Sequence, residues 1–401
     1  MSHADLATAL SDARVIVCAG TGGVGKTTIS AALALEAAQA GRATLVLTID
    51  PARRLADALG LDELGPTPQS VDIEALAEGA GARAIEGSLS AMMLDPKPTF
   101  DGIVARFARD EATRERILEN RIYRNLSEAL AGSAEYAAMI QVYELIEGGD
   151  YDLIVVDTPP ADHALDFLRA PKRMREFLES RFVKSLVHPA VSASRFGARI
   201  LGRGLERILS LIERVAGGGF LDDISEFMQA VDGLSLGLDE RSKRVEEFLL
   251  GPESSFILVC GGHARANASA IEFLSELDAF RVPLVSVVAN RLRPWPLDVP
   301  ARAGDFALTD SHVEADAKKL SEAIGAPNVG VEIVARLAEY AEVCASQNRG
   351  LADLERAARA RGIACLRIQE LSSDVDRLEG LAAIGRMLAS ASAAHERGGD
   401  P

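Results

Sequence analysis

Residues 20–28 have the sequence Gly20-Thr21-Gly22-Gly23-Val24-Gly25-Lys26-Thr27-Thr28, and this stretch decides the fold of the chain. It follows the apolar run 14–19 and precedes the alanine-rich segment 29–40, which is typical of a helix. A strand, a glycine loop and a helix with the spacing G-x-x-x-x-G-K-T form the context of a phosphate-binding P-loop. The stretch therefore predicts a nucleotide-binding site.

The chemistry of phosphate binding assigns a role to each residue of this loop. Glycines let successive backbone N–H groups turn toward phosphate, and the start of the following helix adds a positive dipole end. Lys26 is expected to bridge the outer phosphates, and the Thr27 hydroxyl to bind Mg²⁺. The predicted nucleotide-binding residues of the loop are Gly22, Gly23, Val24, Gly25, Lys26, Thr27 and Thr28.

Composition restricts the function classes. The chain has 401 residues with 43 basic and 59 acidic side chains, a net charge of −16, so general nucleic-acid binding is not expected. No apolar run reaches the roughly 18–20 residues of a membrane-spanning helix, and the start of the chain lacks the basic region and apolar core of a signal peptide. We therefore expect a cytoplasmic protein without an integral membrane segment.

Short apolar runs recur along the chain and alternate with helical patterns. The pattern predicts an α/β fold of the P-loop NTPase type, with a mostly parallel central sheet flanked by helices. We expect one ATPase domain over residues 1–401, a helical insertion subdomain formed by 97–147 and 170–250, and a flexible tail over 388–401. The predicted strands are 15–18, 44–49, 89–94, 153–156, 256–260, 284–289 and 363–368.

Two aspartates end predicted strands, where an α/β sheet binds its ligands. Asp157 follows the run 153–156, the place of an aspartate that serves Mg²⁺. Asp50 ends the run 44–49, and its carboxylate is placed to face the γ-phosphate. Because Asp50 precedes Pro51, an ordinary turn or cap role remains an equal alternative on the residues alone.

At this point the sequence resembles the arsenite-pump (ArsA) ATPases and the tail-anchored-protein targeting ATPases of the Get pathway. The P-loop resembles their G-K-G-G-V-G-K-T-T, and residues 50–57, Asp-Pro-Ala-Arg-Arg-Leu-Ala-Asp, resemble their first switch segment. Residues 157–165 resemble the second switch, residues 89–96 resemble the family element L-x-A-M-E-I-D-P, and residues 287–291 resemble a strand that ends in an adenine-contacting Asn. The likeness spans residues 14 to 370, in the family's order.

The resemblance implies an ATPase that uses ATP and Mg²⁺. It implies that Asp50 orients the attacking water, that Thr27 and Asp157 serve Mg²⁺, and that Asn290 contacts the adenine. It also implies that His163 couples the nucleotide to the helical subdomain, with an ordinary loop histidine as the alternative.

The chain departs from the family at charged positions. The signature lysine after the first P-loop glycine is Thr21 here, and the switch His and its small polar neighbour are Arg53 and Arg54. In relatives that lysine reaches across a dimer to the partner's phosphates. Since Arg suits phosphate recognition, we expect one of the two arginines to supply the missing positive charge.

Three functions follow from these observations. The leading one is an ATPase whose nucleotide state opens and closes a helical client- or partner-binding subdomain, of the anion-transporting or membrane-protein-targeting type. The second is a nucleotide-binding scaffold with negligible turnover because of Thr21, and the third is a MinD/ParA-like positioning ATPase. The resemblance implies a homodimer, with a heterodimer of related chains as the alternative, and a membrane-protein client or membrane partner.

Overall fold

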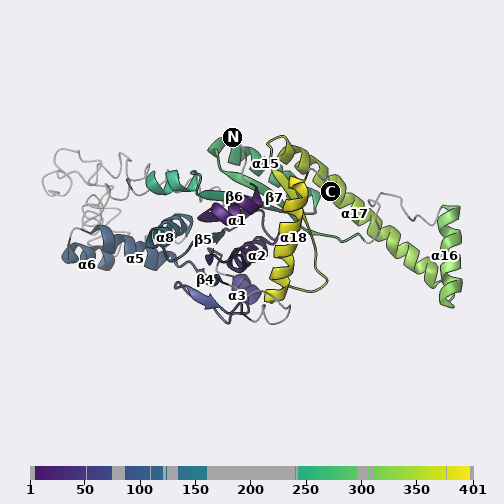
Figure 1. Cartoon of the computed structure of the whole chain (residues 1–401), viewed down its shortest axis with the longest axis horizontal. Helices are drawn as coiled ribbons and strands as arrows, with labels where there is room; N and C mark the ends of the chain where they lie inside the picture. Colours follow the sequence, from purple (N-terminus) through teal and green to yellow (C-terminus); the bar gives the residue numbers. More distant parts are fainter. Residues whose placement is uncertain are drawn as a thin grey trace, which may run out of the picture.

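A computed structural model of the chain describes residues 5–50, 52–74, 86–108, 110–120, 123, 134–159, 240, 243–295, 306, 310–375 and 377–397. Its strands are β1 (Val15–Gly20), β2 (Ala43–Thr48), β3 (Gln69–Val71), β4 (Ser88–Met93), β5 (Leu153–Asp157), β6 (Ser254–Gly261), β7 (Leu284–Leu292) and β8 (Ala364–Gln369). They form one eight-stranded sheet in the order β3-β4-β2-β5-β1-β6-β7-β8 (Figure 1).

The mostly parallel sheet predicted from the sequence is confirmed. Each of the seven expected apolar runs lies on a strand, and these seven strands pair in parallel. The eighth strand, β3, was not predicted and pairs antiparallel to β4 at the edge of the sheet. Its three residues, Gln-Ser-Val, include a single buried apolar side chain, too little for a recognisable strand pattern.

Helices cover both faces of the sheet. One face packs against α1 (Leu6–Asp12), α2 (Lys26–Gln39), α3 (Arg54–Leu59) and α18 (Leu378–Glu396). The other packs against α5 (Pro96–Phe107), α6 (Glu111–Glu119), α8 (Ala134–Gly148), α15 (Ala264–Phe280) and α17 (Val329–Arg359). Val15 and Val17 of β1 enter the second core, whereas Ile16 and Cys18 enter the first. This two-residue alternation explains why the strands are continuous apolar runs, since both faces are buried.

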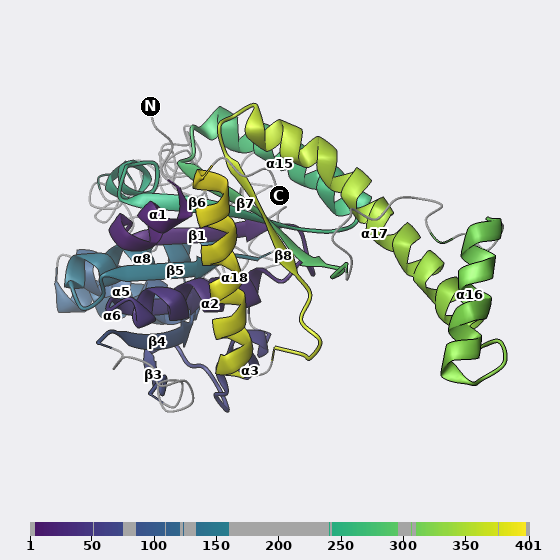
Figure 2. The ribbon, with the colours of Figure 1, turned by 45° about the vertical axis from the view of Figure 1, so that its right-hand side comes forward.

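The alanine-rich α2 lies between the sheet and α18 (Figure 2). Helix α18 approaches α2 closely at its Gly385, where an added Cβ would lie 2.7 Å from Glu36 Oε2 of α2. This packing corrects the expected flexible tail over 388–401. Helix α18 continues to Glu396, and Leu388 and Ser392 are buried, so the tail prediction is wrong for residues 388–396. The small residues of that segment are a helix-packing surface rather than a linker.

Part of the predicted helical insertion is seen in α5, α6 and α8. Asp95 accepts a hydrogen bond from the Lys97 N–H at the start of α5, and Asp110 caps α6 in the same way through Thr113. Residues 160–239, which include most of the expected second insertion, lie outside the described residues. The subdomain as a whole therefore stays a prediction.

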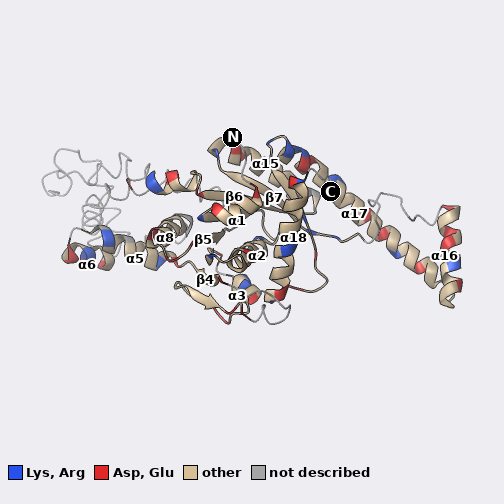
Figure 3. Ribbon diagram, viewed as in Figure 1, with Lys and Arg blue, Asp and Glu red and all other residues tan. Residues whose placement is uncertain are grey.

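Helix α16 (Ser311–Ile324) and the N-terminal part of α17 form a hairpin that projects from the body of the molecule, here called the α16–α17 arm (Figures 1 and 2). The two helices cross closely at Gly330, whose N–H donates to Ser321 Oγ at 2.9 Å. Charges of both signs occur along the arm (Figure 3). Among the described residues, the exposed large apolar side chains, Leu320, Ile324, Ile333 and Val343, all lie on it.

Candidate nucleotide-binding site

The P-loop joins β1 to α2 in the conformation that the glycines permit. Gly23 and Gly25 have φ angles of +79° and +90°, in the left-handed region that favours glycine. Gly25 also lacks room for a side chain, because a Cβ there would lie 2.5 Å from Asn290 Nδ2. Helix α2 begins at Lys26, so its positive dipole end points at the loop.

A pocket of about 710 Å³ opens beside this loop, within the range of small-molecule sites. It is lined from the P-loop, the end of β2, the start of α3, the end of β5 and the end of β7. The lining residues are Gly22, Gly23, Gly25, Lys26, Thr27, Thr28, Ile49, Asp50, Arg54, Asp57, Ala58, Thr158, Pro159, Arg291 and Val375. The structure thus brings most of the predicted nucleotide-binding residues to one cavity. Val24 lies behind it and is buried.

The Lys26 side chain is largely buried at the base of the P-loop. Its Nζ donates to the Thr21 carbonyl at 3.0 Å, which folds the ammonium back along the loop. Burial lowers the pKa of Lys26, and the nearby carboxylates of Asp157 and Asp50 oppose that shift. An ammonium carries three N–H donors, so this bond leaves donors for a phosphate oxygen.

Asp157 ends β5 between its neighbours β1 and β2, where the register pairs it with Cys18 and Thr48. Its Oδ2 accepts hydrogen bonds from the hydroxyls of Thr27 at 2.8 Å and Thr48 at 3.0 Å. The side chain is 1% exposed, and burial raises its pKa to about 6, although the two hydroxyls and Lys26 lower it. The Thr27–Asp157 pair predicted to serve Mg²⁺ is therefore in contact.

These residues fit a magnesium ion. Oδ1 of Asp157 is buried and has no hydrogen-bond partner among the described residues, an arrangement that costs free energy unless a cation or water satisfies it. Within the described part of the chain, no group of three or more His, Cys, Asp or Glu side chains could hold a metal ion. A site that holds Mg²⁺ through few protein oxygens together with nucleotide phosphates agrees with both observations.

Asp50 has the turn role that the sequence left open, and it also lines the pocket. Its Oδ1 accepts a hydrogen bond from the Ala52 N–H at 3.0 Å, which is the turn role. Its own N–H donates to Thr48 Oγ1 at 3.2 Å, and its carboxylate lines the pocket. Thr48 therefore links Asp50 and Asp157, so the ends of β2 and β5 hold both carboxylates beside the loop.

Asn290 lies within β7, one position beyond the predicted strand; it is almost fully buried, at 3% exposure, and is not among the residues that line the pocket. Its Nδ2 donates to the Val24 carbonyl at 3.0 Å, so the side chain braces the P-loop. Arg291, next to it, has a φ of +58°, lines the pocket and donates from Nη1 to the Gly23 carbonyl at 3.3 Å. The end of β7 thus holds the loop at two carbonyls.

Sequence reasoning missed Thr48 and the loop-bracing role of Arg291. Thr48 carried a usable signal, because a polar residue at the end of a buried strand two positions before Asp50 lies at the same sheet edge. Arg291 carried none, because its contact depends on a left-handed backbone that non-glycine residues rarely adopt. His163 lies outside the described residues, so its coupling role remains a prediction.

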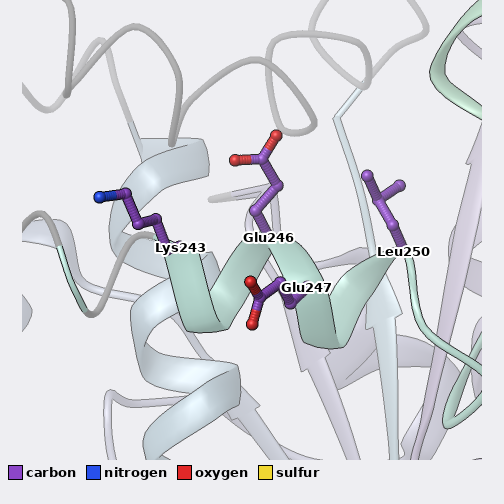
Figure 4. Close-up of a pocket in the computed structure, with 4 residues that line it drawn as sticks. All are labelled: Lys243, Glu246, Glu247 and Leu250. Atoms are coloured by element: carbon purple, nitrogen blue, oxygen red, sulfur yellow. The ribbon is translucent and has the colours of Figure 1, made fainter.

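A second pocket, of about 470 Å³, is lined by Lys243, Glu246, Glu247 and Leu250. All four belong to one short helical segment and the turn after it (Figure 4). The P-loop pocket, by contrast, gathers residues from several strand ends. Because parallel sheets bind ligands at the carboxyl ends of their strands, the P-loop pocket is the candidate site.

Comparison with known proteins agrees with this geometry. The family described as anion-transporting ATPase, ArsA_ATPase, matches residues 13–295. Relatives named ATPase get3 include those of Aspergillus terreus, 27% identical over 282 residues, and Aspergillus niger, 26% identical over 282 residues; each alignment covers 70% of this chain and 73% of the relative. The relative in Neurospora crassa is 25% identical over 281 residues, again 70% of this chain and 73% of its own length.

The family match includes the P-loop, both aspartates and Asn290, and it ends before the α16–α17 arm. Within the described part of the chain, no helix is both long enough and apolar enough to cross a membrane. Fold, pocket and sequence match agree, and the chain belongs to the ArsA-type, anion-transporting ATPase family.

Proposed function

We propose that this chain binds ATP with Mg²⁺ in the P-loop pocket and hydrolyses it to ADP and phosphate. The observation that carries the proposal is the convergence of Lys26, Asp50 and Asp157 on one glycine loop. Positioning and charge neutralisation account for most of the catalysis of phosphoryl transfer. The P-loop backbone, the buried Lys26 ammonium and the Asp50 carboxylate line the pocket, and the Asp157 carboxylate is hydrogen-bonded to Thr27 of that lining, so together they meet both needs.

Each side chain has a distinct task in this reaction. The backbone N–H groups of residues 22–28 and the start of α2 hold the phosphates, and the Lys26 ammonium neutralises their outer oxygens. Asp50, fixed through its Oδ1 to the Ala52 N–H, keeps Oδ2 to accept a hydrogen bond from the attacking water. Asn290 holds the P-loop in place through the Val24 carbonyl, and we place the adenine next to this end of β7 on the family resemblance.

Thr27 and Asp157 would hold the magnesium ion, which when bound supplies positive charge beside the β- and γ-phosphates. The Thr27 hydroxyl donates its proton to Asp157, and the lone pairs of its oxygen would remain available to the ion. Thr48 can then continue to orient the Asp157 carboxylate. This arrangement keeps Asp157 in place without a second acidic side chain.

Steady-state turnover of Mg·ATP tests the proposal, with wild type compared against Lys26→Ala and Asp50→Asn. We expect measurable turnover in wild type and a loss of about 100-fold or more in each variant. Asp50→Asn keeps an oxygen that can accept from the Ala52 N–H, so its fold and ATP affinity should be preserved. Equal turnover in wild type and Asp50→Asn would overturn the proposal.

A second candidate function is a nucleotide-binding scaffold. It is favoured by Thr21, which stands where the resembled relatives carry the lysine that reaches a partner's phosphates. The same assay separates the two functions: tight binding of ATP by wild type without turnover supports the scaffold.

We also propose that the nucleotide state is coupled to a partner or a membrane-protein client through the helical insertion, and that the chain works as a dimer with itself or with a related chain. The support is the family resemblance and the position of α5 and α8, which pack on the sheet face opposite α2. Light scattering on the purified chain with ADP, with ATP and without nucleotide tests the dimer. A monomer in all three states would exclude the homodimer.

A further inference from the structure

Thr21 stands where the P-loop motif of the resembled family has a lysine, so this chain does not carry that positive charge. We propose that Arg54 of the same chain supplies this charge, by contacting the γ-phosphate as it is cleaved. The proposal rests on the hydrolysis proposed above. It makes Arg54 a catalytic residue that acts without a partner subunit.

Arg54 is in the right place for this role. It begins α3, four residues after Asp50, and both side chains line the pocket. Its Nη1 lies 3.9 Å from Asp50 Oδ2, and its side chain is 69% exposed. An ion pair so long and exposed contributes little to stability. The guanidinium is therefore able to leave Asp50 for a phosphate, which offers it a planar, charge-assisted contact.

Arg53 and Arg291 have other positions. The Arg53 side chain donates to the carbonyl of Asp62 and is not among the residues that line the pocket. Arg291 does line the pocket but is tied to the Gly23 carbonyl on the P-loop side. Arg54 is thus the arginine beside the carboxylate that orients the water. Burial is the main cause that lowers the pKa of Lys26, and the positive charge of Arg54 also lowers it.

The chemistry assigns Arg54 a purely electrostatic task. The water oxygen forms a bond to the γ-phosphorus while the bond from that phosphorus to the β–γ bridging oxygen breaks, and ADP leaves with the bonding electrons. The water proton passes to the phosphate product. Arg54 keeps its own protons throughout and offsets the negative charge on the γ-oxygens in the transition state.

The test compares Arg54→Ala with Arg53→Ala, two neighbouring arginines with different contacts. At saturating Mg·ATP, we expect kcat to fall about 100-fold or more in Arg54→Ala, while Arg53→Ala stays within about threefold of wild type. Affinity for ADP should be unchanged in both variants. Affinity for ADP with fluoroaluminate, which mimics the transferring phosphoryl group, should fall only in Arg54→Ala.

The outcomes separate the two proposals. An inactive wild type contradicts the proposed hydrolysis, and the fluoroaluminate comparison then still judges Arg54. Equal kcat and equal fluoroaluminate affinity in the two arginine variants overturn the assignment of Arg54, even when wild type is active.

Mixing two inactive variants tests whether Arg54 acts within its own chain. Lys26→Ala keeps Arg54, and Arg54→Ala keeps an intact P-loop. Action within one chain predicts that the mixture remains inactive at every ratio. Recovery of turnover on mixing would show that Arg54 reaches a partner's nucleotide, and would overturn the proposal as stated.

Discussion

Replacing Asp157 by Asn should stabilise the nucleotide-free protein while it weakens magnesium binding. Asp157 is 1% exposed, one of its oxygens has no partner among the described residues, and burial raises its pKa to about 6 from an ordinary value of 3.8. Between pH 4 and pH 6, the Asp157 carboxyl of the folded protein therefore holds a proton that the same carboxyl of the unfolded protein has released. The contribution of this carboxyl to the free energy of unfolding therefore falls as pH rises through that window.

The size of the effect follows from the two pKa values. Linkage gives a loss on the order of 1 kcal/mol in the free energy of unfolding between pH 5 and pH 7.5, and about 3 kcal/mol between full protonation and full ionisation. Asn can still accept hydrogen bonds from the hydroxyls of Thr27 and Thr48, but it carries no charge. The stability of Asp157→Asn relative to wild type should therefore increase on the order of 1 kcal/mol over this pH range.

Urea unfolding of both proteins at several pH values, without nucleotide and with a chelator, measures this difference. Other titrating groups are common to the two proteins and cancel. A stability difference that does not change with pH would refute the reasoning. A difference that shrinks as pH rises would show the opposite, namely that the native site favours the charged carboxylate.

Three further predictions test the packing around the site. Gly25→Ala should lower the free energy of unfolding by about 1–2 kcal/mol, because alanine disfavours the left-handed backbone, and its Cβ should displace Asn290. Nucleotide affinity measured by calorimetry should therefore fall about tenfold or more, and unchanged affinity would contradict the close contact. Leu388→Ala should lower the free energy of unfolding by about 2–5 kcal/mol, whereas a flexible tail predicts no change. Gly330→Val should separate α17 from α16, because a Cβ at this position meets the Ala317 carbonyl oxygen at 2.2 Å. The melting temperature should change, whereas ATP turnover should not.

The sheet was predictable because strands that are buried on both faces have continuous apolar sequences. Continuous apolar runs identified seven strands, and the P-loop spacing located the site at their carboxyl ends. The short edge strand β3 contains no such apolar run. The helical end of the chain was misjudged because alanine and serine suit both a loose tail and a close helix contact, and only the position of α2 decides between them.

The site was predictable in its residue types but not in its contacts. The motif named Lys26, Thr27, Asp50 and Asp157, and the structure places all four around the P-loop. Which of Arg53 and Arg54 lines the pocket depends on the direction in which each side chain leaves the start of α3. That direction is set by tertiary packing, so the sequence left both arginines open.

Single-turnover cleavage of ATP tests the central claim most directly, because it separates binding from chemistry. Wild type and Asp50→Asn are each mixed in excess over labelled Mg·ATP, and bound nucleotide and released phosphate are followed together. We predict that wild type converts its bound ATP to ADP and phosphate, while Asp50→Asn binds ATP equally well and leaves it intact. Phosphate release at the same rate from both proteins would show that Asp50 takes no part in the reaction.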